Sequence, residues 1–213
     1  MRYCPRCAQP LALGLIGGRE RAYCAKDGCG YVFFGDFSIG CGGVVIRDGK
    51  ALLVQRALDP GKGSWQIPGG YVEADENVAE AVVRECYEEA RITAEVVDVL
   101  GFRHSVGGNG SIGGPSTNIY VVFRLRLVGG DPVADGVESA AAGFFGLDEM
   151  EGMERVQSLS KWAIQRALHS GPGMTTAHRG SDPSRPGWTL FGLPLPEGIE
   201  QVPMSVPPRR PGP

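Results

Sequence analysis

The chain has 213 residues, of which 42% are hydrophobic and 21% are charged, which is typical of one substantial domain with a smaller accessory part. The formal net charge of −3 gives no sign of a nucleic-acid or membrane surface, so an anionic ligand would need bound metal and local Arg or Lys side chains. No apolar run approaches the roughly 18 residues of a membrane span, and the first residues lack a signal-peptide pattern, so we expect a cytoplasmic protein.

Four of the six cysteines lie early in the sequence, as Cys4-x2-Cys7, then sixteen residues, then Cys24-x4-Cys29. Two short knuckles on either side of a hairpin-length insert predict one tetrahedral Zn²⁺ held by four thiolates. Because the protein supplies all four ligands, this site is expected to be closed and structural. Two disulfides in an exported protein are the alternative, but thiols stay reduced in the cytoplasm. We therefore expect residues 1–35 to form a small zinc ribbon.

From residue 36 the sequence alternates between strand-like and helix-like segments. Residues 38–47 and 50–56 predict two strands joined at Asp48-Gly49, a pair typical of a tight hairpin. The later predicted elements are a short strand at Trp65, a helix from about Asn77, one long bent strand or a strand pair over 94–106, strands at 119–127 and 143–146, and a helix at 159–169, with loops at 107–118 and 131–142. The glycine-rich loop 107–118 is either a long connection or a lid over a ligand.

The composition changes again after Ser170. Ten of the sixteen prolines lie between Pro172 and Pro213, with few periodic apolar positions, which predicts a disordered tail over 171–213. A short apolar stretch at 188–195 interrupts it. This stretch either docks on the domain or on a partner, or has no function.

Three carboxylates of the predicted helix share one face. Glu85, Glu88 and Glu89 stand at i, i+3 and i+4, a spacing at which like charges repel by a few tenths of a kcal/mol per pair. A hard divalent cation would turn this repulsion into a ligand set, since Mg²⁺ binds carboxylate oxygens together with substrate phosphates. A solvated acidic helix face is the alternative.

Residues 65–92 resemble the Nudix box, Gly-x5-Glu-x7-Arg-Glu-U-x-Glu-Glu-x-Gly-U, where U is aliphatic. Gly70, Glu76 and the run from Arg84 to Ile92 match this spacing throughout. Cys86 replaces an aliphatic residue, which a small buried thiol can do. Arg91 replaces the last Gly, which would end the helix in the left-handed conformation. A non-Gly residue pays about 1 kcal/mol for that geometry, so the helix end is expected to differ.

The resemblance implies an α/β/α sandwich with a mixed sheet over 36–170, and a set of site residues. By resemblance, Mg²⁺ (or Mn²⁺) is held by Glu85, Glu88, Glu89 and a backbone carbonyl of the glycine pair, such as that of Gly70. A further family acid precedes the last strand, where Glu138 is the best match. Arg84 would orient a box glutamate by ion pairing, while Glu76 would support the loop and metal region. Glu85 and Glu89 are expected to be metal ligands first and general bases second.

The resemblance also implies cleavage of a nucleoside diphosphate linked to a second moiety. The branch with an N-terminal ribbon favours ADP-ribose or FAD, with NADH next. The candidate substrate-binding residues are Glu76, Arg103, His104 and Tyr120, because the strand around residue 103, the loop 107–118 and the tyrosine offer stacking surface for an adenine or flavin ring. The alternatives are a non-catalytic nucleotide sensor, a dNTP-sanitising hydrolase and, with the least support, a ribbon that binds nucleic acid. A homodimer is left open.

Overall fold

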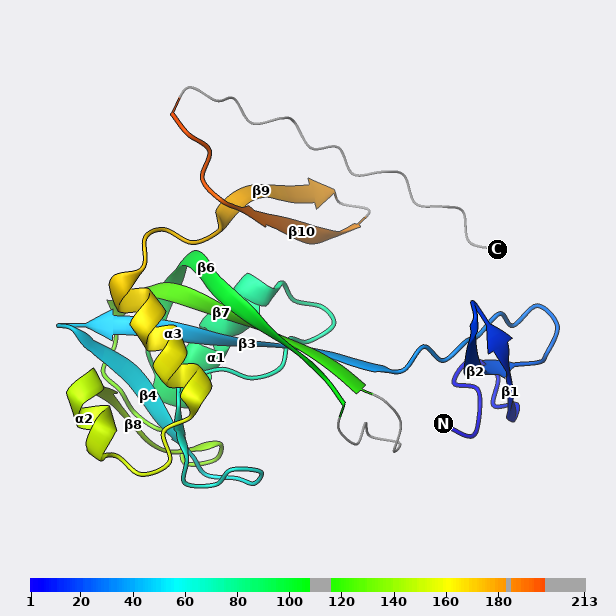
Figure 1. Ribbon diagram of the computed structural model, residues 1–213, viewed down its shortest axis with the longest axis horizontal. Helices are drawn as coiled ribbons and strands as arrows, with labels where there is room; N and C mark the ends of the chain where they lie inside the picture. Colours follow the sequence, from blue (N-terminus) through cyan, green and yellow to red (C-terminus); the bar gives the residue numbers. More distant parts are fainter. Residues whose placement is uncertain (108–115, 183–184, 198–213) are drawn as a thin grey trace. The chain divides into compact units, whose positions relative to one another are not determined.

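The computed structural model describes residues 1–107, 116–182 and 185–197 (Figure 1). The chain divides into two compact units. The first contains Met1–Ser38 and His104–Ile119, and the second contains Ile39–Arg103 and Tyr120–Pro213. The first unit therefore combines the expected ribbon with the outer part of a later strand pair, which the sequence did not predict.

The first unit contains an antiparallel hairpin of β1 (Leu11–Ile16) and β2 (Arg19–Cys24). Its turn is Gly17–Gly18, and both glycines have positive φ, as a tight turn requires. Isolated bridges join Tyr3 to Pro10 and Tyr23 to Val32, so the chain on both sides of the hairpin is tied back to it.

A six-stranded sheet forms the centre of the second unit. The strands are β3 (Asp36–Arg47), β4 (Lys50–Arg56), β5 (Trp65–Gln66), β6 (Thr93–Val106), β7 (Ser116–Gly129) and β8 (Ser139–Phe145). They follow the order β5-β4-β3-β7-β6, and β8 pairs with β4. The pairing of β4 with β8 is antiparallel and ends with Arg56 opposite Ser139. This register brings the segment just before β8 beside the end of β4.

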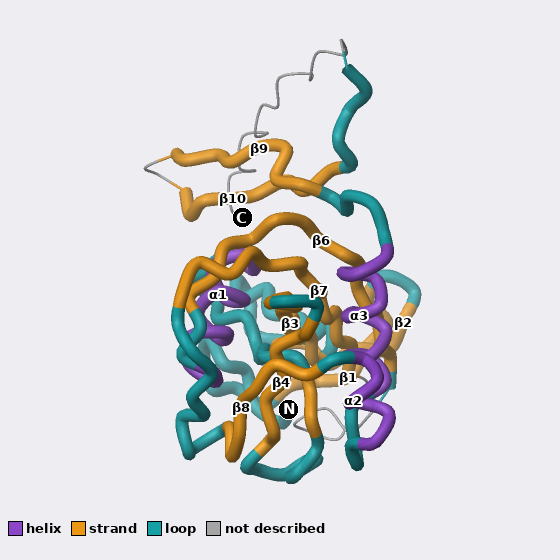
Figure 2. The backbone as a smooth tube through the Cα atoms, turned by 90° about the vertical axis from the view of Figure 1, so that its left-hand side faces the viewer, coloured by secondary structure: helices purple, strands orange, loops and turns teal. Residues whose placement is uncertain are grey.

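Three helices complete this unit: α1 (Val78–Ala90), α2 (Leu147–Gly152) and α3 (Ser158–His169). Figure 2 shows α1 and α3 on opposite sides of the strands. Val82 and Cys86 of α1 are fully buried in one apolar cluster with Phe123 of β7. Ala163 and Ile164 of α3 belong to a second cluster on the other face. The helix–sheet–helix layering expected from the sequence is present. No helix in these described ranges has the length and apolar character needed to span a membrane.

Helix α1 ends in the left-handed conformation that a glycine would adopt at this position, although the residue is Arg91. Arg91 has φ 56° and ψ 26°, and its N–H donates to the carbonyl of Tyr87 at 2.8 Å. The expectation of a different helix end was wrong, because Arg91 adopts the left-handed conformation itself. Its guanidinium lies 5.4 Å from the centre of the Tyr87 ring, a contact that offsets part of the strain.

Two other expectations need correction. The segment 131–142 is not all loop, because β8 already begins at Ser139. The sequence 171–213 is not a disordered tail throughout, because β9 (Thr175–Asp182) and β10 (Arg185–Gly192) form an antiparallel hairpin. The rest of that prediction, 198–213, lies outside the described residues, as does 108–115 of the glycine-rich loop. The segment 94–106 belongs to one strand, β6, which was one of the two alternatives.

Contacts with the sheet explain why the C-terminal hairpin forms despite its prolines. The backbone of Met174 exchanges two hydrogen bonds with Val99 of β6, at 2.8 and 3.1 Å. The Gly173 N–H donates to the buried carboxylate of Asp98 at 2.8 Å. Phe191 packs edge-on against Phe123 at 5.7 Å. The apolar stretch predicted from the sequence therefore docks on the domain, at least through Phe191.

Candidate functional site

The site is built where the start of the box meets helix α1. The Gly69 N–H donates a 2.8 Å hydrogen bond to a carboxylate oxygen of Glu89, which is only 5% exposed. A Cβ on Gly70 would lie 2.5 Å from a carboxylate oxygen of Glu85, and a Cβ on Gly69 would collide with the carbonyl of Cys41. Glycine at both positions is thus what allows the helix carboxylates to lie directly against this turn.

Three of the predicted acidic residues converge. Glu85, Glu89 and Glu138 each offer a carboxylate oxygen, and these oxygens lie within 4.8 Å of one another. The first two come from α1 and the third from the residue before β8. Three carboxylates from two separate elements at this spacing match the oxygen ligands of a hard divalent cation. The carbonyl of Gly70 accepts a hydrogen bond from the Cys41 N–H at 2.9 Å and keeps a second lone pair.

The electrostatics of the two helix glutamates also fit a cation. Burial raises the pKa of Glu89 to about 8. The hydrogen bond from the Gly69 N–H lowers this pKa, whereas the negative charges of Glu85 and Glu138 raise it further. Burial likewise raises the pKa of Glu85, although Arg84 opposes it. Buried carboxylates this close together are costly as anions, and a bound cation would remove that cost.

Arg84 holds the acidic residues of the box together. Its guanidinium binds both oxygens of Glu76, at 3.0 and 2.8 Å, and its Nη1 donates to Glu85 at 2.9 Å and to Glu88 at 2.7 Å. Nη2 also donates to the carbonyl of Tyr71 at 3.1 Å. The hydrogen bonds from Arg84 hold the pKa of Glu76 below its usual value. Arg84 therefore binds Glu85 directly, and both carboxylate oxygens of Glu76 accept hydrogen bonds from it.

Glu88 occupies a different place from the other helix acids. Its side chain is 53% exposed and is paired with Arg84. It does not belong to the group of converging carboxylates found among the described residues. The shared helix face predicted from the i, i+3, i+4 spacing thus divides into a buried pair and an exposed third member.

The candidate substrate residues fall into two groups. Tyr120 is half-buried, its hydroxyl lies 2.5 Å from where a Cβ of Gly42 would be, and the guanidinium of Arg103 lies 5.4 Å from the centre of its ring. Burial raises the pKa of Tyr120. His104 belongs to the first unit, where its Nε2 lies 2.8 Å from the hydroxyl of Thr117. Arg103 and Tyr120 therefore form one stacked pair, and His104 belongs to a separate group.

Sequence reasoning missed Arg56 at the end of β4. The positive charge of Arg56 opposes the rise in the pKa of Glu89, and the Nε of Arg56 donates to the carbonyl of Pro60 at 3.0 Å. A cation at the end of a strand has no signal of its own in a single sequence. Only the pairing of β4 with β8 brings it to the carboxylates.

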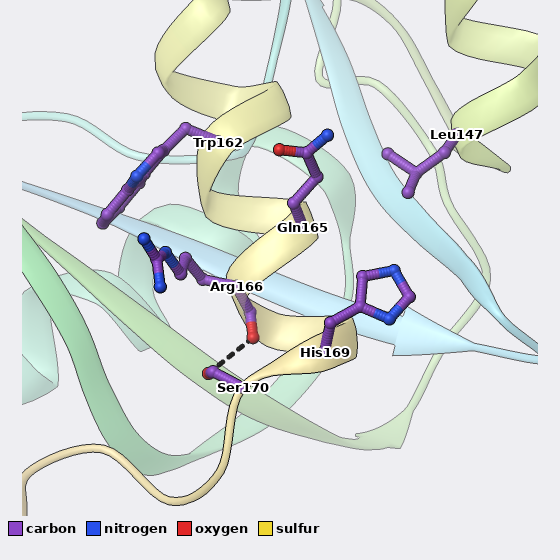
Figure 3. Close-up of a pocket in the computed structure, with 6 residues that line it drawn as sticks. All are labelled: Leu147, Trp162, Gln165, Arg166, His169 and Ser170. Atoms are coloured by element: carbon purple, nitrogen blue, oxygen red, sulfur yellow. Dashed lines mark hydrogen bonds between the residues drawn. The ribbon is translucent and has the colours of Figure 1, made fainter.

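A separate shallow hollow of about 380 Å³ lies on the outer side of α3 (Figure 3). It is lined by Leu147, Trp162, Gln165, Arg166, His169 and Ser170. The guanidinium of Arg166 lies 5.8 Å from the centre of the Trp162 ring, so these two side chains are engaged with each other. None of the predicted site residues lines this hollow.

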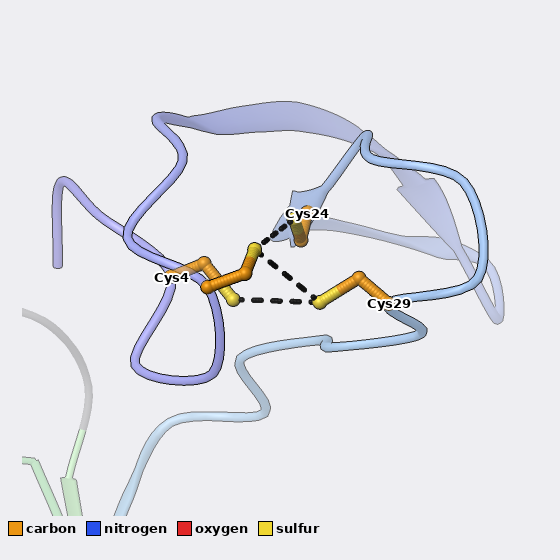
Figure 4. A group of neighbouring side chains, drawn as sticks. Cys4, Cys24 and Cys29 are labelled. Carbon is orange, nitrogen blue, oxygen red and sulfur yellow. Dashed lines mark hydrogen bonds between the residues drawn. The ribbon is translucent and has the colours of Figure 1, made fainter.

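The four early cysteines also converge (Figure 4). The sulfur of Cys7 lies 3.5 Å from that of Cys24 and 3.7 Å from that of Cys29, and the Cys4 and Cys29 sulfurs are 3.6 Å apart. The sulfur–sulfur bond of a disulfide is about 2.05 Å long, so these sulfurs are too far apart to be bonded. Four sulfurs bound at about 2.3 Å around tetrahedral zinc lie about 3.8 Å apart. The cysteine group is therefore shaped like a four-thiolate metal site.

A sheet lies between helical layers, and helix carboxylates gather against a Gly-Gly turn, where they offer oxygen ligands for a divalent cation. The family model described as NUDIX domain matches residues 39–165, which is more than half of the chain. The chain belongs to the Nudix family.

Individual relatives support this assignment. The chain is 34% identical over 143 residues to an ADP-ribose pyrophosphatase from Methanocaldococcus jannaschii, covering 66% of this chain and 81% of that protein. It is 27% identical over 166 residues to the NAD-capped RNA hydrolase NudC from Chromobacterium violaceum, covering 78% of this chain and 58% of that protein. The crystal structure of a Nudix hydrolase from Nitrosomonas europaea is similar in fold, with a TM-score of 0.64 at 24% identity, covering 81% and 96% of the two chains.

Proposed function

We propose that the protein is a Mg²⁺-dependent pyrophosphohydrolase that splits a nucleoside diphosphate linked to a second moiety into two monophosphates. Mn²⁺ would serve in place of Mg²⁺. The observation that carries the proposal is the convergence of Glu85, Glu89 and Glu138 within 4.8 Å of one another. Substrates of this kind bring several phosphate oxygens, which are the usual partners of Mg²⁺ bound through few carboxylates.

Each residue has a defined part in this proposal. Glu85, Glu89, Glu138 and the Gly70 carbonyl would hold the cation, with the exposed Glu88 available on the solvent side. When bound, the cation would lower the pKa of a water and neutralise the diphosphate. Arg84 keeps the Glu85 carboxylate in place through its 2.9 Å bond. Glu89 accepts a hydrogen bond from the Gly69 N–H. In its ionised form, this carboxylate is the candidate for accepting the proton of the attacking water.

For the substrate we favour ADP-ribose or FAD, with NADH next. The 34% identity to an ADP-ribose pyrophosphatase supports the first of these. The Arg103–Tyr120 pair supplies a cation and an aromatic side chain beside one another, which suits an anionic ligand with an aromatic base. Glu76 would support the loop and metal region through Arg84, whose guanidinium binds both of its carboxylate oxygens.

A nucleoside triphosphate is the second candidate. Over 93 residues the chain is 36% identical to a putative 8-oxo-dGTP diphosphatase 2 from Mycobacterium tuberculosis, covering 43% of this chain and 62% of that protein. This match supports the shared catalytic region more than a shared pocket, because it covers less than half of the chain.

We further propose that Cys4, Cys7, Cys24 and Cys29 hold a structural Zn²⁺ and that the protein works in the cytoplasm. The 3.5–3.7 Å sulfur separations support the metal, and free thiols are typical of a reducing compartment. A hairpin module of this size has too little core to fold alone, so the metal would supply the missing free energy.

The experiment that tests the enzymatic proposal is a substrate panel assayed with the full chain and Mg²⁺, with products separated by chromatography. The proposal predicts hydrolysis at the diphosphate, abolished by a chelator and restored by Mg²⁺. Binding of nucleotides without turnover would favour the sensor alternative.

A further inference from the structure

Glu138 differs from the two helix glutamates with which it converges. Glu85 and Glu89 are buried and lie on α1, whereas Glu138 is exposed and lies in the connection between β7 and β8. A carboxylate in a connecting segment contributes to a metal site only when its backbone is fixed. What fixes Glu138 is therefore a question about the neighbouring residues.

The backbone of this connection is held from outside at two points. The Val133 N–H donates to the carbonyl of Ala90 at the end of α1, at 2.9 Å. The Ala57 N–H, just after β4, donates to the carbonyl of Glu138 at 2.8 Å. These bonds tie the connection to the box helix and to the end of β4, but they leave the chain between 133 and 138 to be shaped by its own residues.

Asp135 shapes that interval. Its Oδ1 accepts hydrogen bonds from the N–H groups of Val137 at 3.0 Å, Glu138 at 3.1 Å and Ser139 at 2.8 Å. Its Oδ2 lies 3.3 Å from the Glu138 nitrogen. Gly136 turns the chain with φ 75° and donates to the Ser139 carbonyl at 3.0 Å. Three successive N–H groups thus surround one carboxylate.

This arrangement depends on the negative charge of Asp135. Hydrogen bonds to an ionised acceptor are about twice as strong as neutral ones, and an aspartate that bonds the backbone two to four residues ahead fixes a local turn. Partial burial opposes ionisation, but the N–H groups of Ser139, Val137 and Glu138 outweigh it and lower the pKa of Asp135.

We infer that Asp135 is a positioning residue that fixes the backbone of Glu138 and so delivers its carboxylate to the cation site. This inference rests on the proposed function, since it takes Glu138 as a metal ligand. Asp135 does not itself belong to the converging carboxylates among the described residues. Its effect on the metal must therefore pass through Glu138.

The test measures Mn²⁺ binding directly, by isothermal titration calorimetry on the full chain without substrate. Asp135→Ala is expected to weaken Mn²⁺ binding about 10- to 100-fold, the usual cost of losing a residue that orients a metal ligand. Asp135→Asn keeps an acceptor oxygen but loses the charge, so it should weaken binding less. Asp131→Ala is the matched control. Asp131 lies in the same connection, is 87% exposed and pairs with Arg47. This control should bind Mn²⁺ as the parent protein does.

A double-mutant cycle distinguishes positioning from a general loss of structure. Once Glu138→Gln has removed the ligand, adding Asp135→Ala should weaken Mn²⁺ binding no further. Equal losses of affinity in the parent and Glu138→Gln backgrounds would overturn the inference, as would unchanged binding in Asp135→Ala. If Asp135→Ala unfolds, Asp135→Asn must show the same background dependence, and its failure to do so would equally overturn it.

Activity separates this inference from the proposed function. A parent protein that binds Mn²⁺ and shows the coupling, yet hydrolyses no diphosphate substrate, would refute the function and support the positioning role. If the parent protein hydrolyses ADP-ribose and Asp135→Ala binds Mn²⁺ normally, the proposed function is supported and the positioning role of Asp135 is refuted.

Discussion

Substituting alanine for Gly70 separates catalysis from stability, because the added methyl group meets a side chain and not the backbone. Its Cβ would lie 2.5 Å from one carboxylate oxygen of Glu85, 2.9 Å from the other and 2.7 Å from the carbon between them. A relaxed nonbonded contact needs about 3.5 Å, so the carboxylate has to move by about 1 Å. Glu85 is attached through flexible bonds and can make this movement.

The expected result is a large loss of activity with little loss of stability. A displacement of about 1 Å in a catalytic group costs about 100-fold in rate, which corresponds to about 2.7 kcal/mol. The free energy of unfolding should change by less than about 1 kcal/mol, because reduced flexibility of the unfolded chain partly offsets the strain. The assay is kcat/KM for ADP-ribose with saturating Mg²⁺, accompanied by urea unfolding.

Gly69→Ala is the contrasting control. There the Cβ would collide with the backbone carbonyl of Cys41, which cannot move away as a side chain can. This variant should lose about 1–3 kcal/mol of stability as well as activity. Parental kcat/KM in a folded Gly70→Ala protein would refute the claim that Glu85 must lie against the turn.

The remaining predictions concern the other carboxylates, the helix end and the cysteine site. Glu89→Gln should lower kcat at least about 100-fold with a parental circular dichroism spectrum, and Glu88→Gln should lower it less, since Glu88 is exposed; the opposite order would contradict the buried site. Arg91→Gly should be about 1 kcal/mol more stable than Arg91→Ala in urea unfolding, because both lose the Tyr87 contact and only glycine relieves the left-handed strain; equal stabilities would exclude that strain. Metal analysis should find one Zn²⁺ per chain and none in Cys7→Ser, whose hairpin module should unfold; a metal-free parent protein with unchanged structure would defeat the zinc assignment.

Much of the central site could be predicted because it is local in sequence. The box places Glu85 and Glu89 on the same helix, and a period of 3.6 residues per turn fixes their common direction. Likewise, Asp48-Gly49 specifies its hairpin through φ values of 52° and 76° that few other pairs adopt. In these cases, residues a few positions apart determine the geometry without help from the rest of the fold.

The parts that sequence reasoning missed depend on distant partners. The structural role of Asp135 becomes visible only when the register of β4 with β8 brings Glu138 to α1. The hairpin β9–β10 was hidden by its proline-rich composition, although Phe191 finds Phe123 on the sheet. Local propensity was outweighed there by tertiary packing. The exposure of Glu88 was missed because helical spacing alone does not say which of the three carboxylates the rest of the fold covers; Glu88 stays at the surface, paired with Arg84.

The most direct test of the central claim is product analysis with ADP-ribose, FAD, NADH and dGTP side by side, each with Mg²⁺ and with Glu89→Gln as the inactive control. The account predicts that the good substrates share an adenosine diphosphate moiety and that each releases AMP through cleavage between the two phosphates. A wide preference for dGTP with release of pyrophosphate would contradict the proposed pocket. No hydrolysis of any of the four by a metal-loaded, folded protein would contradict the proposed substrate class as a whole.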